Sequence, residues 1–139
     1  MRALIITAVL AAVLIGFVFG NAAFSISVLA DRIGGVNAFN YRIASTAIFV
    51  LLVAWLHARL TAGPGWLPRA VLAGVLWLGL SVTLELTIAR VVMGVSWPNV
   101  LATYAIWRGE PWPFVLLLEL ISPILFGWLR NRQHDAGRS

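Results

Sequence analysis

Cysteine is absent from the 139 residues, and lysine is absent too, so that all ten basic residues are arginine. Without cysteine the chain can form no disulfide, no thiol nucleophile and no cysteine-bound iron–sulfur cluster. The two histidines, His57 and His134, stand far apart and form no HExxH pattern, so we expect them to be interfacial or solvated. We therefore predict no metal site and no cofactor.

Charged residues are scarce as well: they make up 11% of the chain, against 61% hydrophobic residues, and the mean hydropathy is +0.94. A soluble domain of this size is far more polar, so lipid must be the main solvent. The net charge is +5, but the arginines are spread over span ends and connections. That spread is typical of topology signals and contact with anionic lipids, and it disfavours nucleic acid as a partner.

Long apolar runs predict an all-α integral membrane protein with four transmembrane helices, since a span needs about 20 apolar residues. We place the spans at residues 3–29, 41–57, 69–93 and 113–130, with a short interfacial helix at 97–109 and a polar tail at 131–139. The whole chain, residues 1–139, forms a single transmembrane four-helix bundle in this prediction. A small excess of arginine on one side of the membrane predicts that both termini lie in the cytoplasm.

The first predicted span carries a stripe of small residues at every fourth position: Ala8, Ala12, Gly16 and Gly20. Such a stripe lets two helix backbones approach closely where lipid supplies no hydrophobic driving force. We expect this face to pack on another helix, either within the chain or across a homo-oligomer or a complex with a partner subunit.

Two carboxylates, Glu85 and Glu119, interrupt the third and fourth spans. An ionisable group in lipid costs roughly 2.5 to 3.5 kcal/mol, so each should face protein and have a partner. Antiparallel neighbouring helices would bring the two to similar depth. The candidate counter-ions for them are Arg42, Arg90 and Arg108.

Small and polar side chains accompany both carboxylates. On the third span Gly74, Ser81, Glu85 and Ala89 share one helix face, and Gly79, Thr83, Thr87 and Arg90 share the opposite one. We expect a helix of this kind to be packed on both faces and to form the centre of the bundle.

On the fourth span Pro123 has no N–H for the carbonyl of Glu119, and Ser122 lies close by. A free carbonyl beside a carboxylate can bind a cation or a hydroxyl. The sequence leaves two interpretations open, a structural Glu–Arg network and a ligand, proton or ion site.

The second half of the chain resembles a largely uncharacterised family of small, four-span bacterial inner-membrane proteins. The resemblance rests on Trp77, Leu84-Glu85, Gly94-Val95-Ser96-Trp97, Tyr104, Arg108-Gly109, Trp112-Pro113 and Pro123. It implies the four-span fold and draws attention to Glu85, but it implies no activity. The chain departs from the family pattern in three places: Thr103 stands for an Asp, Glu110 for an Arg, and no Arg–Glu pair follows Asn21.

Three functions fit these observations. The first is a non-catalytic accessory or helper subunit that binds partner helices or lipid, since no nucleophile–base set is visible. The alternative is a small oligomeric carrier or channel that uses Glu85 and Glu119 for a proton, a cation or a small cationic solute. An enzyme acting on lipid, with these carboxylates as acid and base, ranks last.

Overall fold

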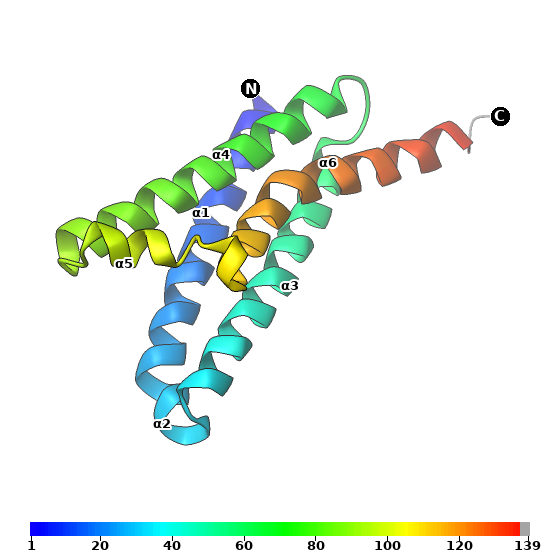
Figure 1. Ribbon diagram of the computed structural model, residues 1–139. Coiled ribbons are helices and arrows are strands. Elements are labelled where there is room, and N and C mark those ends of the chain that lie inside the picture. The colour runs from blue at the N-terminus through cyan, green and yellow to red at the C-terminus, as the bar shows by residue number, and fades with distance from the viewer. Residues whose placement is uncertain (137–139) are drawn as a thin grey trace.

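The computed structural model describes residues 1–136, and from residue 133 onward it describes the backbone alone. Every regular element in this part of the chain is a helix, which confirms the predicted all-α class (Figure 1). Four helices are long and apolar enough to cross a membrane; they span Arg2–Ile33, Gly35–Thr61, Trp66–Val92 and Trp112–Arg132.

These long helices contain smaller elements. The first joins α1 (Arg2–Phe24), a π-helical turn (Ser25–Leu29) and α2 (Ala30–Ile33), and the second is α3 (Gly35–Thr61). The third joins α4 (Trp66–Thr87) and a π-helical turn (Ile88–Val92), and the last is α6 (Trp112–Ala136). Between α4 and α6 lie the short α5 (Trp97–Ala102) and a 3₁₀ turn (Ile106–Arg108).

Several predicted boundaries differ from the structure. The predicted span 41–57 is part of the longer α3, and the predicted interfacial helix at 97–109 is divided into α5 and the 3₁₀ turn. Residues 30–40 were expected to form a connection, but they are helical on both sides of Gly34. Gly34 has a φ of 83°, a conformation that costs glycine little, so one residue turns the chain and helices start on either side of it. The expected polar tail continues α6 as far as Ala136, and residues 137–139 lie outside the described part.

The prediction that the third span is packed on both of its faces is wrong. α4 does contact each of the other long helices, α6 most extensively and α3 only slightly, but it does so through one face. One face of α4 carries its buried residues, Ala70, Ala73, Gly74, Trp77 and Ser81, whereas Gly79, Thr83 and Thr87 on the opposite face are exposed. Small residues on that second face therefore meet no helix of the described chain.

Side chains of α1 and of the π-helical turn that follows it donate hydrogen bonds to α3. The Asn21 amide donates to Ser45 Oγ at 2.8 Å and to Thr46 Oγ1 at 3.0 Å, and Ser25 Oγ donates to the Ala38 carbonyl at 2.7 Å. Such bonds hold helices together where the surrounding lipid is as apolar as the side chains.

His57 belongs to the same interface, so the expectation of an interfacial or solvated side chain is wrong. Its side chain is fully buried; Nε2 lies 3.0 Å from Thr7 Oγ1, and Nδ1 lies 3.4 Å from Thr61 Oγ1. The Thr7 and Thr61 hydroxyls donate to the Ala3 and His57 carbonyls, so each can only accept from the ring; because Thr7 is the nearer acceptor, we assign the proton of the neutral imidazole to Nε2. The side chain of His134 lies outside the described part.

The small-residue face of α1 packs on no other helix of the described chain. Ala8, Ala12, Gly16 and Gly20 are all exposed or partly exposed, and a Cβ added to Gly16 or Gly20 would meet nothing within 4 Å in the described structure. α1 instead buries the adjacent face with Thr7, Leu10, Ala11, Leu14, Val18 and Asn21. Packing against a second molecule stays a prediction for this face.

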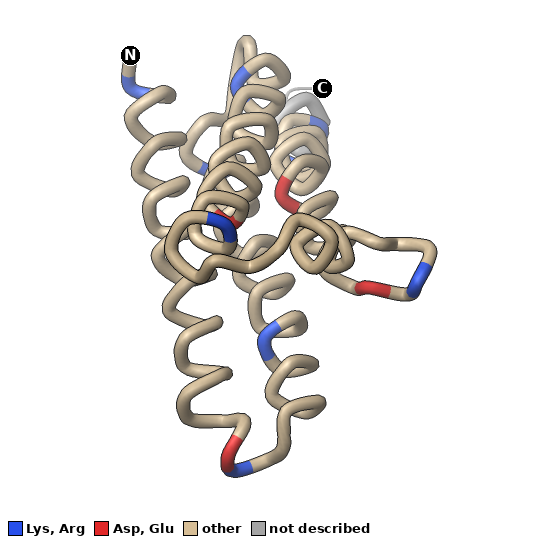
Figure 2. Tube along the Cα trace, turned by 60° about the vertical axis from the view of Figure 1, so that its left-hand side comes forward, with Lys and Arg blue, Asp and Glu red and all other residues tan. Residues whose placement is uncertain are grey.

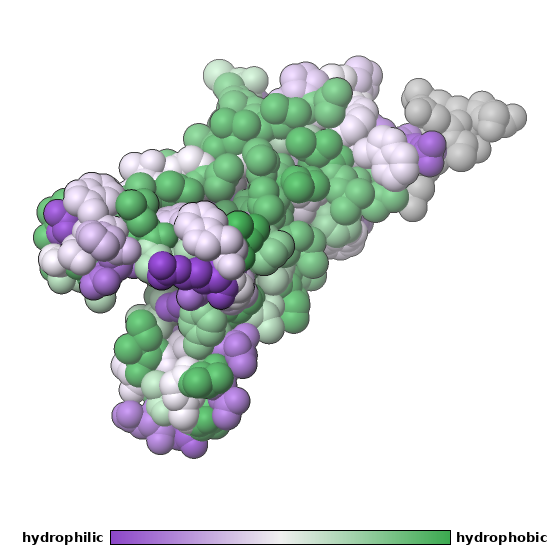
Figure 3. Space-filling model, viewed as in Figure 1, coloured by the Kyte–Doolittle hydropathy of each residue, from purple (hydrophilic) through white to green (hydrophobic). Residues whose placement is uncertain are grey.

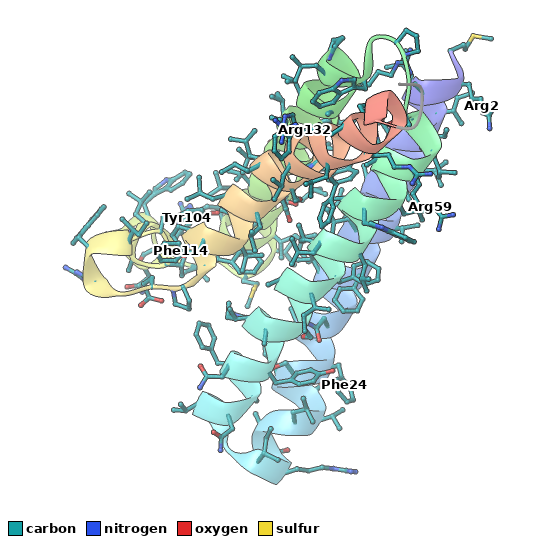
Figure 4. All side chains as sticks on the ribbon, turned by 90° about the vertical axis from the view of Figure 1, so that its right-hand side faces the viewer. Arg2, Phe24, Arg59, Tyr104, Phe114 and Arg132 are labelled. Carbon is teal, nitrogen blue, oxygen red and sulfur yellow. The ribbon has the colours of Figure 1, made fainter. Side chains whose placement is uncertain are left out.

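The surface follows the helix layout. Most charged positions lie at helix ends and in connections, and a few lie inside the bundle (Figure 2). A hydrophobic body separates polar ends in the space-filling view (Figure 3). Arg2, Arg59 and Arg132 lie towards the end opposite α2 (Figure 4), and there Arg59 and Arg132 stack on Trp55 and Trp128 at 4.8 and 4.2 Å. Arginine and tryptophan pairs of this kind are typical of a membrane–water interface.

Candidate functional site

A cavity of about 450 Å³ lies between the α1–α3 pair and the α4–α6 connection. The two lobes that enclose it diverge in the ribbon view, and a notch separates them in the space-filling view (Figures 1 and 3). Most of its wall is apolar, from Ile15, Val18, Phe19, Ala22, Ala23, Ile26, Phe39, Ile88, Ala89 and Met93. Polar groups come from Arg42, Thr46, Ser81, Glu85, Thr103, Glu110 and Trp112. The volume is typical of a small-molecule site, roughly 300 to 1,000 Å³.

Glu85 is held at the cavity by two donors on the α5–α6 segment. Tyr104 Oη donates to Glu85 Oε2 at 2.7 Å, and Trp112 Nε1 donates to the same oxygen at 2.8 Å. Burial, and then the hydrogen bond to the Glu85 carboxylate, raise the pKa of Tyr104, so its hydroxyl stays protonated at neutral pH and can donate. This pair of bonds ties the connection to α4 and fixes the carboxylate at the cavity wall.

Arg42 is the predicted counter-ion that reaches Glu85. Its half-buried side chain lines the cavity and interacts electrostatically with Glu85. Its guanidinium lies 5.2 Å from the centre of the Phe39 ring, and its Nε has no hydrogen-bond partner among the described residues. Arg42 therefore places a cation at the cavity wall, with one buried N–H that has no partner in the described part of the chain.

Arg90 and Arg108 do not reach either carboxylate in this arrangement. Arg90 donates to the Val95 carbonyl and lies 4.9 Å from the Trp97 ring, because the break after α4 folds these residues back towards it. Arg108 lies exposed on the 3₁₀ turn. Both were predicted counter-ions of the carboxylates. Arg90 interacts with a backbone carbonyl and an aromatic ring instead, and Arg108 is exposed at the surface.

Glu119 is buried deeper than Glu85 and lacks such donors. It is 0% exposed, and neither carboxylate oxygen has a hydrogen-bond partner in the described part of the chain. Ser81 lies next to the carboxylate without forming a hydrogen bond that meets ordinary geometric limits, and Glu85 is near enough to interact with it electrostatically. Since Ser81 also lines the cavity, it lies between the cavity and Glu119.

Ser122 and Pro123 complete the surroundings of Glu119. Both are buried, and the Ser122 hydroxyl has no partner among the described residues either. α6 continues through Pro123, which has no N–H to offer the Glu119 carbonyl. The structure thus brings four of the predicted site residues, Ser81, Glu85, Glu119 and Ser122, into one region beside Arg42.

Several polar partners were not identified from the sequence. Asn21 and His57 make the buried hydrogen bonds of the α1–α3 interface, and the rule that an intramembrane polar group needs a protein partner could have indicated both. Tyr104 and Trp112 donate to Glu85 from 19 and 27 residues away in the chain. Only the family pattern drew attention to them, and it gave them no role.

The arrangement offers binding groups and no visible catalytic set. Within the described residues no group of three or more His, Asp or Glu side chains could hold a metal ion. No family model, curated protein or solved structure matches the chain. The resemblance to a four-span bacterial family therefore stays a prediction.

Proposed function

We propose that this chain is a small, non-catalytic membrane module that binds an anionic, lipid-like molecule in the cavity and acts beside partner helices. The observation that carries the proposal is the cavity itself: an extensive apolar wall suited to hydrocarbon, with one cation among its polar groups. An acyl chain that leaves the bilayer for this wall gains no hydrophobic free energy, so the wall holds it through shape and van der Waals packing.

We choose an anionic head group because of the hydrogen bonds that the polar atoms of the cavity wall already make. Glu85 accepts two hydrogen bonds, whereas Arg42 keeps its Nε free among the described residues. A guanidinium donates to phosphate in a fork geometry that suits a phosphodiester. Glu110 also lines the cavity, and its charge disfavours a head group that carries more than one negative charge.

The departures from the family pattern support a ligand particular to this chain. Thr103 stands for an Asp of the pattern, and Glu110 stands for an Arg. Both positions line the cavity. Compared with the pattern, the cavity wall has lost a negative charge at residue 103 and changed the sign of its charge at residue 110.

The experiment is a lipid-binding measurement by native mass spectrometry, comparing phosphatidylglycerol with phosphatidylcholine on the purified protein. Arg42→Gln should lower the preference for phosphatidylglycerol about tenfold or more, because a charged hydrogen bond contributes roughly 1.5 to 3 kcal/mol. Ala89→Leu adds bulk to the cavity wall and should weaken binding of both lipids.

The matched control is Ala44→Leu, the same substitution at an exposed position of α3 that does not line the cavity. It should bind both lipids as the unchanged protein does. Equal binding by Ala89→Leu and Ala44→Leu, or an Arg42→Gln variant that keeps the full preference for phosphatidylglycerol, would contradict the proposal.

A carrier or channel is the second candidate function, and the relation of Glu85 to Glu119 favours it. The two carboxylates interact electrostatically, and Ser81 adjoins both the cavity and Glu119. Glu85→Gln should then abolish uptake of a cation or proton into proteoliposomes while the protein folds normally, since only the titratable charge is removed. Uptake at the unchanged rate would eliminate this candidate.

For location, we propose the bacterial inner membrane with both termini in the cytoplasm, and association with a second copy or a partner subunit through the exposed face of α1. The four apolar helices support insertion in a membrane. The arginine–tryptophan pairs near Arg59 and Arg132 support an interface at the end that carries the termini.

A further inference from the structure

Glu119 and His57 are the two polar side chains with no exposed surface among the described residues, and only His57 has hydrogen-bond partners. Glu119 is 0% exposed; Ser81, which lies next to its carboxylate, and Ser122, three residues further along α6, are 5% and 1% exposed. Both Glu119 carboxylate oxygens and both serine hydroxyls lack a hydrogen-bond partner among the described residues. Buried polar groups are almost always partnered, and each exception needs a physical reason.

The two serines differ from other hydroxyl residues in these helices. Several hydroxyls donate to the carbonyl four residues earlier, as is usual inside a helix: Thr7 to Ala3, Ser27 to Ala23, Ser45 to Tyr41, Thr61 to His57 and Thr87 to Thr83. Ser81 and Ser122 make no such bond in the described structure. Their oxygens therefore remain available to something other than their own helix.

The backbone of α6 leaves a further oxygen, the carbonyl of Glu119, without its usual helical donor. Pro123 lies inside the helix and cannot donate to the carbonyl of Glu119. Irregular hydrogen bonding of this kind is tolerated at membrane depth where it serves a buried site, and free carbonyls of interrupted helices are the groups that coordinate sodium in membrane transporters.

We infer that Glu119, Ser81 and Ser122, with the Glu119 carbonyl, form a binding site for one monovalent alkali cation of the sodium type. All the donors are oxygens, which hard cations prefer. An unpaired carboxylate in an apolar interior is strongly destabilising, and one positive charge neutralises it. A proton would satisfy one of these oxygens, whereas a metal cation can be shared by all of them.

The charges around the site set the valence of the cation. Glu85, the other carboxylate nearby, already accepts hydrogen bonds from Tyr104 and Trp112 and interacts with Arg42. Glu119 is therefore the carboxylate left for the ion, and a divalent cation would leave a net positive charge inside the bundle. Ser81 also lines the cavity, so the site adjoins the cavity wall at this residue.

This inference goes beyond both proposed functions and depends on neither. An ion can stay at Glu119 as a structural element without any lipid in the cavity and without crossing the membrane. Lipid binding and uptake are measured separately, so a failure of either leaves the result at Glu119 unaffected.

The test is the thermal unfolding midpoint of the full chain in detergent, measured in sodium chloride and in choline chloride at equal ionic strength. Because a ligand that binds only the folded state stabilises it in proportion to the logarithm of its concentration, the midpoint should rise steadily with sodium. Glu119→Gln should abolish the rise, and Ser81→Ala should weaken the sodium affinity about tenfold or more.

Thr83→Ala is the matched control, because it removes a hydroxyl on the opposite, exposed face of the same helix. It should respond to sodium as the unchanged protein does. If Glu119→Gln does not fold, the inference is tested by comparing the sodium dependence of the unfolding midpoint in Ser81→Ala and in Thr83→Ala.

An unchanged protein whose midpoint is the same in both salts overturns the inference, and so does an equal sodium response in Ser81→Ala and Thr83→Ala. Labelling of Glu119 by a hydrophobic carbodiimide, without any sodium response, assigns a proton to the site in place of sodium and likewise overturns the inference.

Discussion

The closest approach between α4 and α6 depends on Gly74, and adding one methyl group there tests the helix packing that positions the candidate sites. A Cβ on Gly74 would lie 2.3 Å from the Leu120 carbonyl oxygen, 3.0 Å from its carbon and 3.2 Å from its Cα. Ordinary contact begins at 3.4 Å, so Gly74→Ala requires a separation of 3.4 − 2.3, or 1.1 Å, at this point. The atoms in the way belong to the backbone and cannot rotate aside.

We expect Gly74→Ala to lower the free energy of unfolding by about 1 to 3 kcal/mol, the usual cost of overpacking a close interface. The gap that opens also removes dispersion contacts along the same interface, which includes Ser81 and Glu119. The sodium response described for Glu119 should therefore weaken in the same variant.

The chain supplies a matched control on the same helix. Gly79 lies on the opposite face, and a Cβ there would meet nothing within 4 Å in the described structure. Gly79→Ala should leave stability unchanged or raise it by up to about 1 kcal/mol, because alanine favours a helix more than glycine does.

Both variants can be compared by reversible unfolding in mixed micelles of a mild detergent and dodecyl sulfate, followed by far-ultraviolet circular dichroism. Free energies of unfolding that agree within about 0.5 kcal/mol, the usual scatter of neutral surface substitutions, would refute the close packing of α4 on α6 at Gly74.

Three further predictions concern other parts of the structure. The pKa of Tyr104 is raised on folding, so its contribution to stability should be constant below about pH 10 and be lost as the pH rises further. Tyr104→Phe should remove this loss of stability at alkaline pH when unfolding is measured from about pH 8 to 11. Thr7→Val keeps the shape of the side chain but leaves His57 Nε2–H without its acceptor, so unfolding in mixed micelles should show a loss of about 1 to 3 kcal/mol, and no loss would contradict the assigned hydrogen bond. Gly20→Leu should leave the stability of the single chain unchanged and reduce chemical cross-linking between copies or to a partner, whereas undiminished cross-linking would argue against the α1 face as an interface.

The sequence by itself determined the fold class and the approximate helix positions. Apolar runs of about 20 residues must be helical in lipid, since every backbone N–H and C=O needs a partner within its own segment. The same physics brought Glu85 and Glu119 to attention, because an ionisable group in such a run requires an explanation. These conclusions use local composition and spacing, which the sequence contains in full.

The tertiary structure alone decided which faces meet. α4 and α1 each carry two plausible packing faces, and the choice depends on steric fit with distant residues, such as Gly74 against Leu120. Likewise only the fold brings Tyr104 to Glu85, leaves Glu119 without a partner among the described residues, and directs Arg90 to its own segment. A change of a few tenths of an ångström makes or breaks a hydrogen bond or a close contact. Helical periodicity predicts the direction in which each side chain leaves its own helix axis, but it does not predict the distance between two helices.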